Sequence, residues 1–292
     1  MSIERVLVIG AGQMGSGIAQ AMAQAGLTVT LSDVCEDLVV KGRNRIEKAL
    51  SKSVEKNKLT REQKAAIIER VSGVVTLDEA AANVDLAIEA AAEKLDVKSE
   101  IFETLDDRCP ARTIFASNTS SLSITTLAAR TRRAGQVIGM HFFNPAPVMN
   151  LVEVVKGLGT TPATITEVDA LVRRLGKIAV EVTDTPGFCG NRIMIPMINE
   201  AVFALMEGVA SVEDIDNVAR LGFNHPMGPL ALSDLIGNDT VLSIMEVLFA
   251  QFGDSKFRPC PLLRKYVAAG WLGRKSSKGF YDYHGERSAP TQ

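Results

Sequence analysis

Short apolar runs alternate with longer segments of helical spacing through the first half of the chain. We predict strands, each short and mainly apolar or β-branched, at Arg5–Ile9, Thr28–Ser32, Val84–Ile88, Thr113–Ala116 and Val137–His141. The helical patterns between them cover Gln13–Ala25, Asp37–Lys58, Val97–Asp107 and Ile124–Arg130. Because strands that alternate with helices form βαβ units, this half is predicted to be a parallel sheet with helices on both faces.

The pattern changes at Asp184-Thr185-Pro186-Gly187, where a Pro-Gly pair marks a turn. Just before it, two further strands and a helix are predicted at Leu151–Val155, Ile178–Val182 and Ile165–Leu175. From Phe188 onward, apolar residues recur at helical spacing. We therefore predict an α/β Rossmann-type domain with a mostly parallel sheet in residues 1–185, followed by an all-helical domain in residues 186–292.

Composition and charge exclude several classes of protein. The 292 residues include 32 basic and 34 acidic side chains, a net charge of −2 that creates no field favouring nucleic acid. The four cysteines are too far apart for a local metal site, which fits a reducing compartment. No signal peptide and no bilayer-spanning run is evident. We expect a cytoplasmic protein without metal or membrane, although a processed organellar form would look the same.

A glycine-rich turn, Gly10-Ala11-Gly12-Gln13-Met14-Gly15, follows the first strand and opens the first helix. Gly10 would allow the tight turn, Gly12 the approach of a pyrophosphate, and Gly15 close packing of helix on strand. Asp33 ends the next strand, where a carboxylate binds ribose hydroxyls and repels a 2′-phosphate. No Arg follows it, so the pattern favours NAD over NADP, with a ligand-free glycine turn as the alternative.

One histidine and one glutamate stand where catalytic groups are expected. His141 ends an apolar strand and precedes Phe142-Phe143-Asn144-Pro145, and ligands bind at this end of parallel strands. Glu153 interrupts the apolar run Leu151–Val155, where a carboxylate is costly unless it is paired. Because a Glu that faces a His orients the ring and increases its basicity, we predict a catalytic pair. Without Glu153, a hydrogen-bonded core histidine would be an equal interpretation.

A run of hydroxyl and amide side chains, Ser117-Asn118-Thr119-Ser120-Ser121, follows another predicted strand. One of these residues is expected to cap the following helix. Five polar side chains in a row exceed what a cap needs, so the segment is also a candidate binding site.

These residues carry a resemblance to the short-chain L-3-hydroxyacyl-CoA dehydrogenase family, most closely its bacterial 3-hydroxybutyryl-CoA dehydrogenases. The resemblance extends over almost the whole chain. The matching motifs are Gly10–Gly15, Ile88–Glu93, Ser117–Ser121, His141–Pro145, Asp184–Phe188, Asn191-Arg192, Gly228-Pro229, Gly273–Lys275 and Gly279–Tyr281. Taken together these motifs are far more specific than the glycine turn alone.

The resemblance implies a role for each matching position. His141 is implied as the catalytic base and Glu153 as its partner, while Ser120 and Asn191 contact the substrate. Glycine-turn residues, Asp33, Glu93, Lys98 and Asn144 are implied as cofactor contacts, and the cofactor is NAD. One departure from the family pattern is Gly190, because larger aliphatic residues usually precede the Asn that matches Asn191.

The implied reaction is oxidation of (S)-3-hydroxybutyryl-CoA, or another 3-hydroxyacyl-CoA, to the 3-ketoacyl-CoA and its reverse. Fatty acid β-oxidation and butyrate metabolism both use this reaction. It needs a base for the hydroxyl proton and a hydride acceptor, roles that suit His141 and NAD.

A basic helix face offers a place for coenzyme A. Lys48, Lys52 and Lys56 recur four residues apart, one turn beyond Arg45. An ordinary solvated surface would have the same pattern, but the resemblance implies that Lys56 contacts the CoA portion. It also implies a homodimer, with the helical domain supplying the dimer contact and part of the substrate cleft.

Two other functions remain open at this stage. A non-enzymatic NAD-binding relative would show no turnover, although Ser120, His141, Glu153 and Asn191 are all present. A dehydrogenase of free 3-hydroxy acids with a lysine catalyst would act without CoA and would tolerate replacement of His141.

Overall fold

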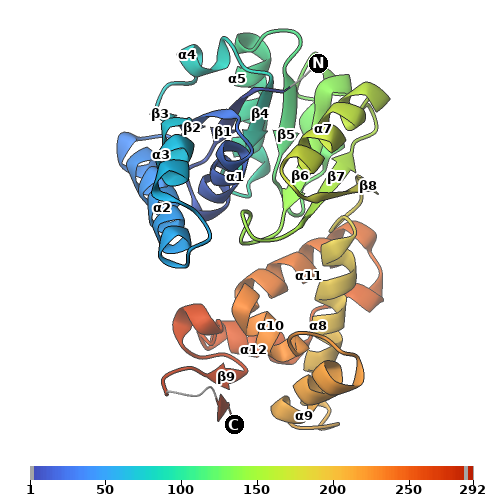
Figure 1. The fold of residues 1–292 in the computed structure, drawn as a ribbon. Helices are drawn as coiled ribbons and strands as arrows, with labels where there is room; N and C mark the ends of the chain where they lie inside the picture. Colours follow the sequence, from blue (N-terminus) through green and yellow to red (C-terminus); the bar gives the residue numbers. More distant parts are fainter. Residues whose placement is uncertain (1–2, 286–288, 292) are drawn as a thin grey trace. The chain divides into compact units, whose positions relative to one another are not determined.

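The computed structural model describes residues 3–285 and 289–291 and divides into two compact units between Thr185 and Pro186 (Figure 1). Each unit has a hydrophobic core of its own. The predicted fold class, a mostly parallel α/β unit followed by a helical unit, is confirmed.

The first unit is built on one eight-stranded sheet in the order β3-β2-β1-β4-β5-β6-β7-β8. Its strands are β1 (Arg5–Ile9), β2 (Thr28–Ser32), β3 (Val71–Val74), β4 (Leu86–Glu89), β5 (Ile114–Ser117), β6 (Val137–Phe142), β7 (Leu151–Lys156) and β8 (Ile178–Thr183). Neighbouring strands are parallel except β6 and β7, which are antiparallel. The chain order reverses at β1 and β4, and in such sheets ligands bind beyond the carboxyl ends of the strands at this point.

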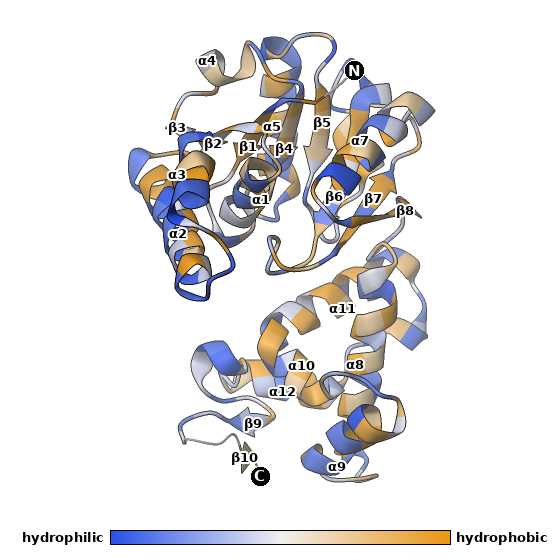
Figure 2. Ribbon diagram, viewed as in Figure 1, coloured by the Kyte–Doolittle hydropathy of each residue, from blue (hydrophilic) through white to orange (hydrophobic). Residues whose placement is uncertain are grey.

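Helices cover both faces of the sheet. They are α1 (Gln13–Gln24), α2 (Glu36–Glu55), α3 (Arg61–Glu69), α4 (Leu77–Ala81), α5 (Leu95–Arg108), α6 (Ile124–Ala128), the 3₁₀ turn η1 (Ala134–Gln136) and α7 (Pro162–Arg174). Residues of α1, α2 and α7 share one core cluster with the strands, whereas Phe102 of α5 packs on Phe115 of β5. Apolar residues are frequent on the central strands, whereas α2 and α3 carry many polar residues (Figure 2).

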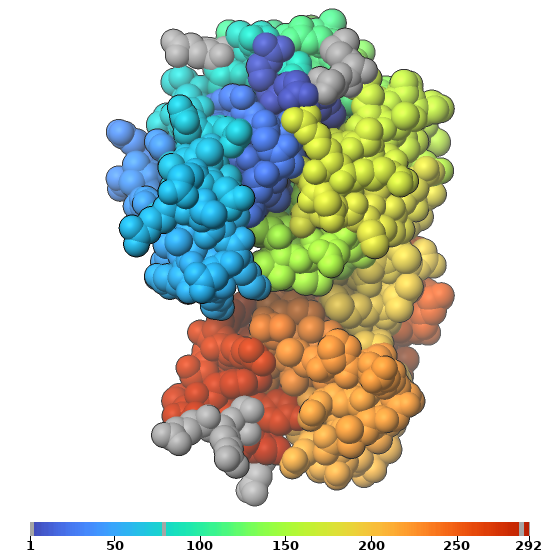
Figure 3. Space-filling model, viewed as in Figure 1, coloured from blue at the N-terminus to red at the C-terminus, as the bar shows by residue number. Residues whose placement is uncertain are grey.

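Three elements of the first unit were not predicted. The helix expected over Asp37–Lys58 ends at Glu55, and Asn57 then adopts a left-handed φ of 53° that cannot continue a helix. Beyond it, α3 leads into β3, which pairs with β2 and forms one edge of the sheet, and α4 follows β3. The segment that contains α2 and α3 forms much of the visible surface on one side of the unit (Figure 3).

The second unit is mainly helical. Its elements are α8 (Gly190–Met206), α9 (Val212–Asn217), the π-helical turn η2 (Val218–Gly222), α10 (Pro229–Ile236), α11 (Asn238–Phe252), η3 (Ser255–Phe257), α12 (Pro261–Ala268), η4 (Arg274–Ser276) and the paired strands β9 (Tyr281–Asp282) and β10 (Ala289–Pro290). In the part of the chain that the structure describes, no single helix has the length and hydropathy to span a membrane. The pair α10 and α11 meets those criteria only jointly and is bent by 97°.

Candidate active site

The glycine turn lies where β1 passes into α1. Gly10 has a φ of +102°, and a Cβ there would come within 2.5 Å of the Ala90 carbonyl oxygen. A Cβ at Gly15 would lie 1.7 Å from the Gly10 carbonyl oxygen, whereas one at Gly12 would meet no atom within 4 Å. The first and third glycines therefore permit close packing, and the backbone at the second remains open to an incoming phosphate.

A cavity of about 660 Å³ adjoins this turn. Gly10, Gly12 and Asp33 line one part of it, and Ala90–Ala92 and residues of α5 line another. This cavity lies at the carboxyl ends of β1, β2 and β4, so its position and the open backbone at Gly12 fit a dinucleotide. The side chain of Met14, a predicted cofactor contact in this turn, is partly buried against the core.

Asp33 is tied to the backbone of the glycine turn. Its carboxylate accepts hydrogen bonds from the N–H of Ala11 at 2.6 Å and from its neighbour Val34 at 2.7 Å. It is half-buried and lines the cavity. Asp33 thus fixes the turn and also presents negative charge to whatever occupies the cavity.

His141 and Glu153 form a buried pair. They are direct cross-strand partners in the antiparallel pairing of β6 with β7, so their side chains lie on the same face of the sheet. His141 Nδ1 is 2.7 Å from a Glu153 carboxylate oxygen. The exposed fractions are 6% for His141 and 1% for Glu153, and the Phe143 ring centroid lies 5.0 Å from that of the imidazole. Low exposure to water strengthens such a pair electrostatically.

Glu93 holds the segment after β5 that contains Ser120. One carboxylate oxygen accepts the N–H groups of Ser120 and Ser121 at 2.9 and 3.1 Å, together with the hydroxyl groups of Thr119 and Ser121. The other oxygen pairs with the Lys98 ammonium at 3.2 Å. Burial opposes ionisation of Glu93, but Lys98 and these hydrogen bonds outweigh it and lower the pKa of the carboxyl.

Lys98, predicted to contact the cofactor, is only 1% exposed. Its ammonium lies 2.7 Å from Glu89, a residue that sequence reasoning missed. Glu89 ends the apolar strand β4 and is fully buried. The signal that pointed to Glu153, a carboxylate in an apolar strand, was present here too.

Gln13, in the glycine turn, contacts Asn144. The Gln13 side-chain amide donates to the Asn144 side-chain oxygen at 3.0 Å. Asn144 precedes a cis peptide bond to Pro145, in the connection from β6 to β7. This contact places Asn144, two residues beyond the end of β6, beside the start of α1.

Two further predicted substrate contacts are Lys56 and Asn191. Lys56 caps the carboxyl end of α2 and is exposed, as are Lys48 and Lys52. Asn191 belongs to the second unit, where it is buried in the first turn of α8. Among residues 3–285 and 289–291, no group of His, Cys, Asp or Glu side chains is arranged to hold a metal ion.

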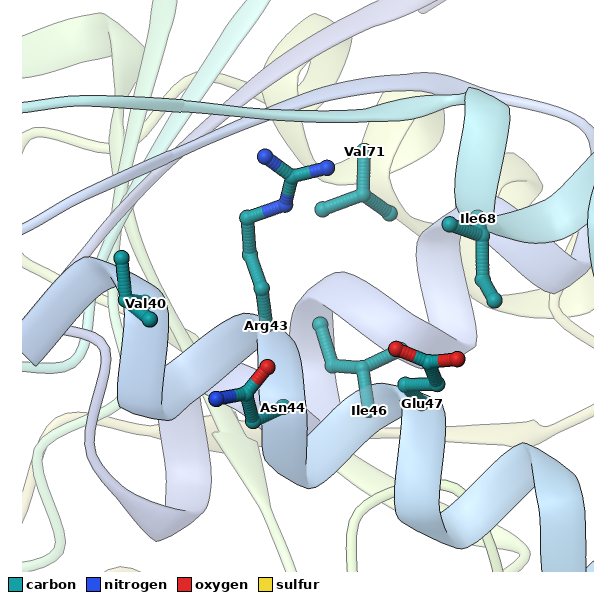
Figure 4. Close-up of a pocket in the computed structure, with 7 residues that line it drawn as sticks. All are labelled: Val40, Arg43, Asn44, Ile46, Glu47, Ile68 and Val71. Carbon is teal, nitrogen blue, oxygen red and sulfur yellow. The ribbon is translucent and has the colours of Figure 1, made fainter.

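A smaller hollow of about 140 Å³ opens between α2, α3 and β3 (Figure 4). Its lining is Val40, Arg43, Asn44, Ile46, Glu47, Ile68 and Val71. None of the predicted site residues is among them, so the candidate site remains at the carboxyl ends of the strands.

Comparison with known proteins agrees with this arrangement. The chain matches the NAD binding domain of 3-hydroxyacyl-CoA dehydrogenase over residues 5–185 and the C-terminal domain of the same family over residues 187–283. It is 56% identical to a probable 3-hydroxybutyryl-CoA dehydrogenase of Bacillus subtilis, with 99% of this chain and 100% of the relative covered. A 3-hydroxybutyryl-CoA dehydrogenase of Bradyrhizobium diazoefficiens is 50% identical, with 99% of each chain covered.

A solved structure shows the same fold. The crystal structure of (S)-3-hydroxybutyryl-CoA dehydrogenase from Ralstonia eutropha aligns with a TM-score of 0.94 at 50% identity, covering 97% of this chain and 100% of that one. Both domain models match in order and together span nearly the whole sequence. The chain therefore belongs to the 3-hydroxyacyl-CoA dehydrogenase family, and its first unit is the NAD-binding domain of that family.

Proposed function

We propose that this protein catalyses the NAD-dependent oxidation of (S)-3-hydroxybutyryl-CoA to acetoacetyl-CoA and the reverse reaction. The observation that carries the proposal is the buried His141–Glu153 pair, held by strand register in the NAD-binding unit. Relatives that cover the full chain are dehydrogenases of this substrate class, which supports the choice of a CoA ester over a free acid.

His141 is the general base for oxidation and the general acid for reduction. The Glu153 carboxylate accepts a hydrogen bond from Nδ1–H, so the neutral ring keeps its proton on Nδ1 and presents its lone pair at Nε2. In oxidation Nε2 takes the proton of the substrate hydroxyl, and Glu153 stabilises the resulting imidazolium. Ser120 and Asn191 orient the substrate oxygens.

The residues around the cavity hold the cofactor. Gly10, Gly12 and Gly15 admit its pyrophosphate, and Asp33 faces the adenosine ribose. Bound NAD supplies a hydride acceptor at its nicotinamide ring. The second unit supplies Asn191 as a substrate contact and carries the homodimer contact, while Lys56 binds the phosphates of coenzyme A.

The test is acetoacetyl-CoA reduction with NADH, and separately with NADPH, for the wild type and His141→Ala. We expect turnover with NADH that falls about 10²-fold or more in the variant. His284→Ala is the matched control, because His284 is exposed and pairs only locally with Asp282. A fully active His141→Ala variant, or activity on free acetoacetate alone, would contradict the proposal and favour a free-acid dehydrogenase. NADH binding without any turnover would favour a non-catalytic relative.

A further inference from the structure

Glu89 is a fully buried carboxylate at the carboxyl end of β4. An ionised carboxylate is retained in such a place only when hydrogen bonds and an opposite charge compensate for lost water. Its neighbours in the strand, Leu86, Ala87 and Ile88, are apolar and buried. The compensation therefore comes from groups outside β4.

Three groups meet this carboxylate. One oxygen accepts the N–H of Ala91 and pairs with the Lys98 ammonium at 2.7 Å. The other accepts the hydroxyl of Ser117 at 2.6 Å. Ser117 is the register partner of Glu89 in β5, so this contact joins the ends of two adjacent strands.

The first contact links Glu89 to the dinucleotide turn. A Cβ at Gly10 would come within 2.9 Å of the Ala91 nitrogen, so the turn packs directly on the segment that Glu89 holds. Ala90, Ala91 and Ala92 also line the cavity beside the turn.

The other two contacts lead to Ser120. Lys98 bridges Glu89 to Glu93, and Glu93 accepts the N–H of Ser120 at 2.9 Å. In parallel, the Ser117 hydroxyl oxygen accepts the N–H of Thr119 at 3.2 Å. Two chains of contacts thus run from one buried carboxylate to the same polar segment.

We propose that Glu89 is a positioning residue that fixes Ser120 relative to the dinucleotide turn. This inference rests on the proposed function, since it uses Ser120 as a substrate contact. Glu89→Gln retains an oxygen that can accept the Ala91 N–H but removes the charge that holds Lys98. The Lys98–Glu93 bridge then loses its anchor, and Ser120 is no longer held in place.

The experiment is a double-mutant cycle on kcat/KM for acetoacetyl-CoA reduction, using Glu89→Gln, Ser120→Ala and the double variant. We expect Glu89→Gln to lower kcat/KM about 10- to 100-fold alone, the loss typical of a charged hydrogen bond, and about twofold or less in the Ser120→Ala background. The NADH dissociation constant, measured by fluorescence, should change by less than about threefold, because the Ala91 contact survives.

Asp85→Asn is the matched control. Asp85 is also a buried carboxylate, just before β4, and accepts the N–H groups of Glu4 and Arg5 rather than any group near Ser120. We expect this variant to lose stability without the loss in kcat/KM. Should Glu89→Gln not fold, Ser117→Ala provides a second test, because it removes the hydroxyl that joins Glu89 to the Thr119 N–H. The loss in kcat/KM from Ser117→Ala should likewise be smaller in the Ser120→Ala background.

The outcomes separate the two proposals. Three results would overturn the role of Glu89 while leaving an active dehydrogenase. They are an equal loss of kcat/KM from Glu89→Gln with and without Ser120, no loss of kcat/KM from Ser120→Ala, and the same loss of kcat/KM from Asp85→Asn. An inactive wild type would overturn the proposed function and this inference with it.

Discussion

His141 and Glu153 show how two residues gain a property that neither has alone. Both side chains are nearly excluded from water, at 6% and 1% exposure. A carboxylate in that position would destabilise the sheet without a partner, and the imidazole provides one at 2.7 Å. Strand register, rather than a flexible loop, sets their separation, so the ring is oriented before substrate binds.

Replacing Glu153 with Gln should therefore reduce turnover while leaving the ring in place. The amide can still accept the Nδ1–H but no longer stabilises an imidazolium, so we expect kcat to fall about 10- to 100-fold in both directions. Steady-state kinetics on the purified variant measure this. Glu181→Gln, an exposed carboxylate on the neighbouring strand β8 that pairs with Lys156, should leave kcat unchanged. Unaltered kcat in Glu153→Gln would exclude an electrostatic role for the pair.

We expect the charge of Asp33 to govern the choice between NADH and NADPH. Its carboxylate lines the cavity, so Asp33→Ser removes negative charge that would repel a 2′-phosphate. We expect the ratio of kcat/KM for NADPH to that for NADH to rise about 10-fold or more, which corresponds to about 1.4 kcal/mol. NADH itself should bind less well, because the Ala11 N–H loses its acceptor. Asp37→Asn, an exposed carboxylate in the first turn of α2, serves as the control and should leave the ratio unaltered.

Elements were predictable from sequence where they are strongly periodic and buried. The β1 strand, the β2 strand and the contact between His141 and Glu153 all followed from apolar runs and from one polar residue within them. The β3 strand escaped because Val71-Ser72-Gly73-Val74 is short, half-exposed and contains glycine. Its formation depends on pairing with β2, a tertiary contact that no local pattern encodes.

The helix α3 was missed although a local signal existed. Thr60 and Gln63 form a reciprocal capping box, which the sequence spacing of Thr and Gln could have indicated. The contacts of Glu93 and Lys98 were less accessible. Both were expected at the cofactor, but the pairing of Lys98 with Glu89 and with Glu93 depends on how α5 packs beyond the end of β4, which no local pattern encodes.

In the second unit, Asp234 of α10 binds the backbone of the segment Phe280-Tyr281 near the carboxyl end of the chain. It is 1% exposed and accepts the N–H groups of Phe280 and Tyr281 at 3.0 and 2.9 Å. It also accepts the side-chain amide of Asn238 at 3.0 Å. Burial raises the pKa of this carboxyl, yet the backbone donors around it require an acceptor.

Asp234→Asn should therefore destabilise the second unit. Its single carbonyl oxygen cannot satisfy the donors on both sides, and each unsatisfied donor costs about 1–3 kcal/mol. Thermal unfolding should show a midpoint lower by several degrees, on the order of 2–4 °C per kcal/mol. The exposed Asp254, which caps the short turn η3, provides the control variant Asp254→Asn. If both variants melted at the wild-type temperature, the Asp234 contacts would contribute no net stability.

At the scale of the whole molecule, exposed apolar side chains of the second unit are consistent with the proposed homodimer. Leu221 and Phe223, in and after η2, are 81% and 66% exposed. Because apolar side chains exposed close together in the chain are candidates for an interface, Leu221→Asp with Phe223→Asp should shift the dimer toward monomer. Light scattering coupled to gel filtration measures the mass. Leu158→Asp, at an equally exposed position in the first unit, should leave the dimer intact, and a monomeric wild type would contradict the proposal.

Acid should affect the two units differently, because the pKa values of their hydrogen-bonded carboxyls are shifted in opposite directions. In the first unit, hydrogen bonds and cations lower the pKa of Asp85, Glu93 and Asp106 against the opposing effect of burial. Such groups stabilise the fold above their unfolded pKa, near 4, and lose that contribution as the pH falls through the lower folded value. In the second unit, burial raises the pKa of Asp234. Ionisation of this carboxyl therefore destabilises the folded unit as the pH rises through the raised pKa, and acid removes that destabilisation by protonating it. Two carboxyls of that unit have a lowered pKa, the exposed Asp254 and the half-exposed Asp282, and both are accessible enough to water to contribute little.

The single tryptophan makes this difference measurable. Trp271 lies in the second unit, packed edge-on against Tyr266, so its fluorescence reports that unit alone. NADH binding and part of the circular dichroism signal depend on the first unit. As the pH is lowered from 6 toward 2, we expect both to be lost at a higher pH than the one at which Trp271 fluorescence changes. The Asp85→Asn variant should move only the earlier transition to higher pH, because the N–H groups of Glu4 and Arg5 have then lost their ionised acceptor. A single transition shared by all probes would mean that the units unfold together and that their opposite carboxyl shifts do not separate them.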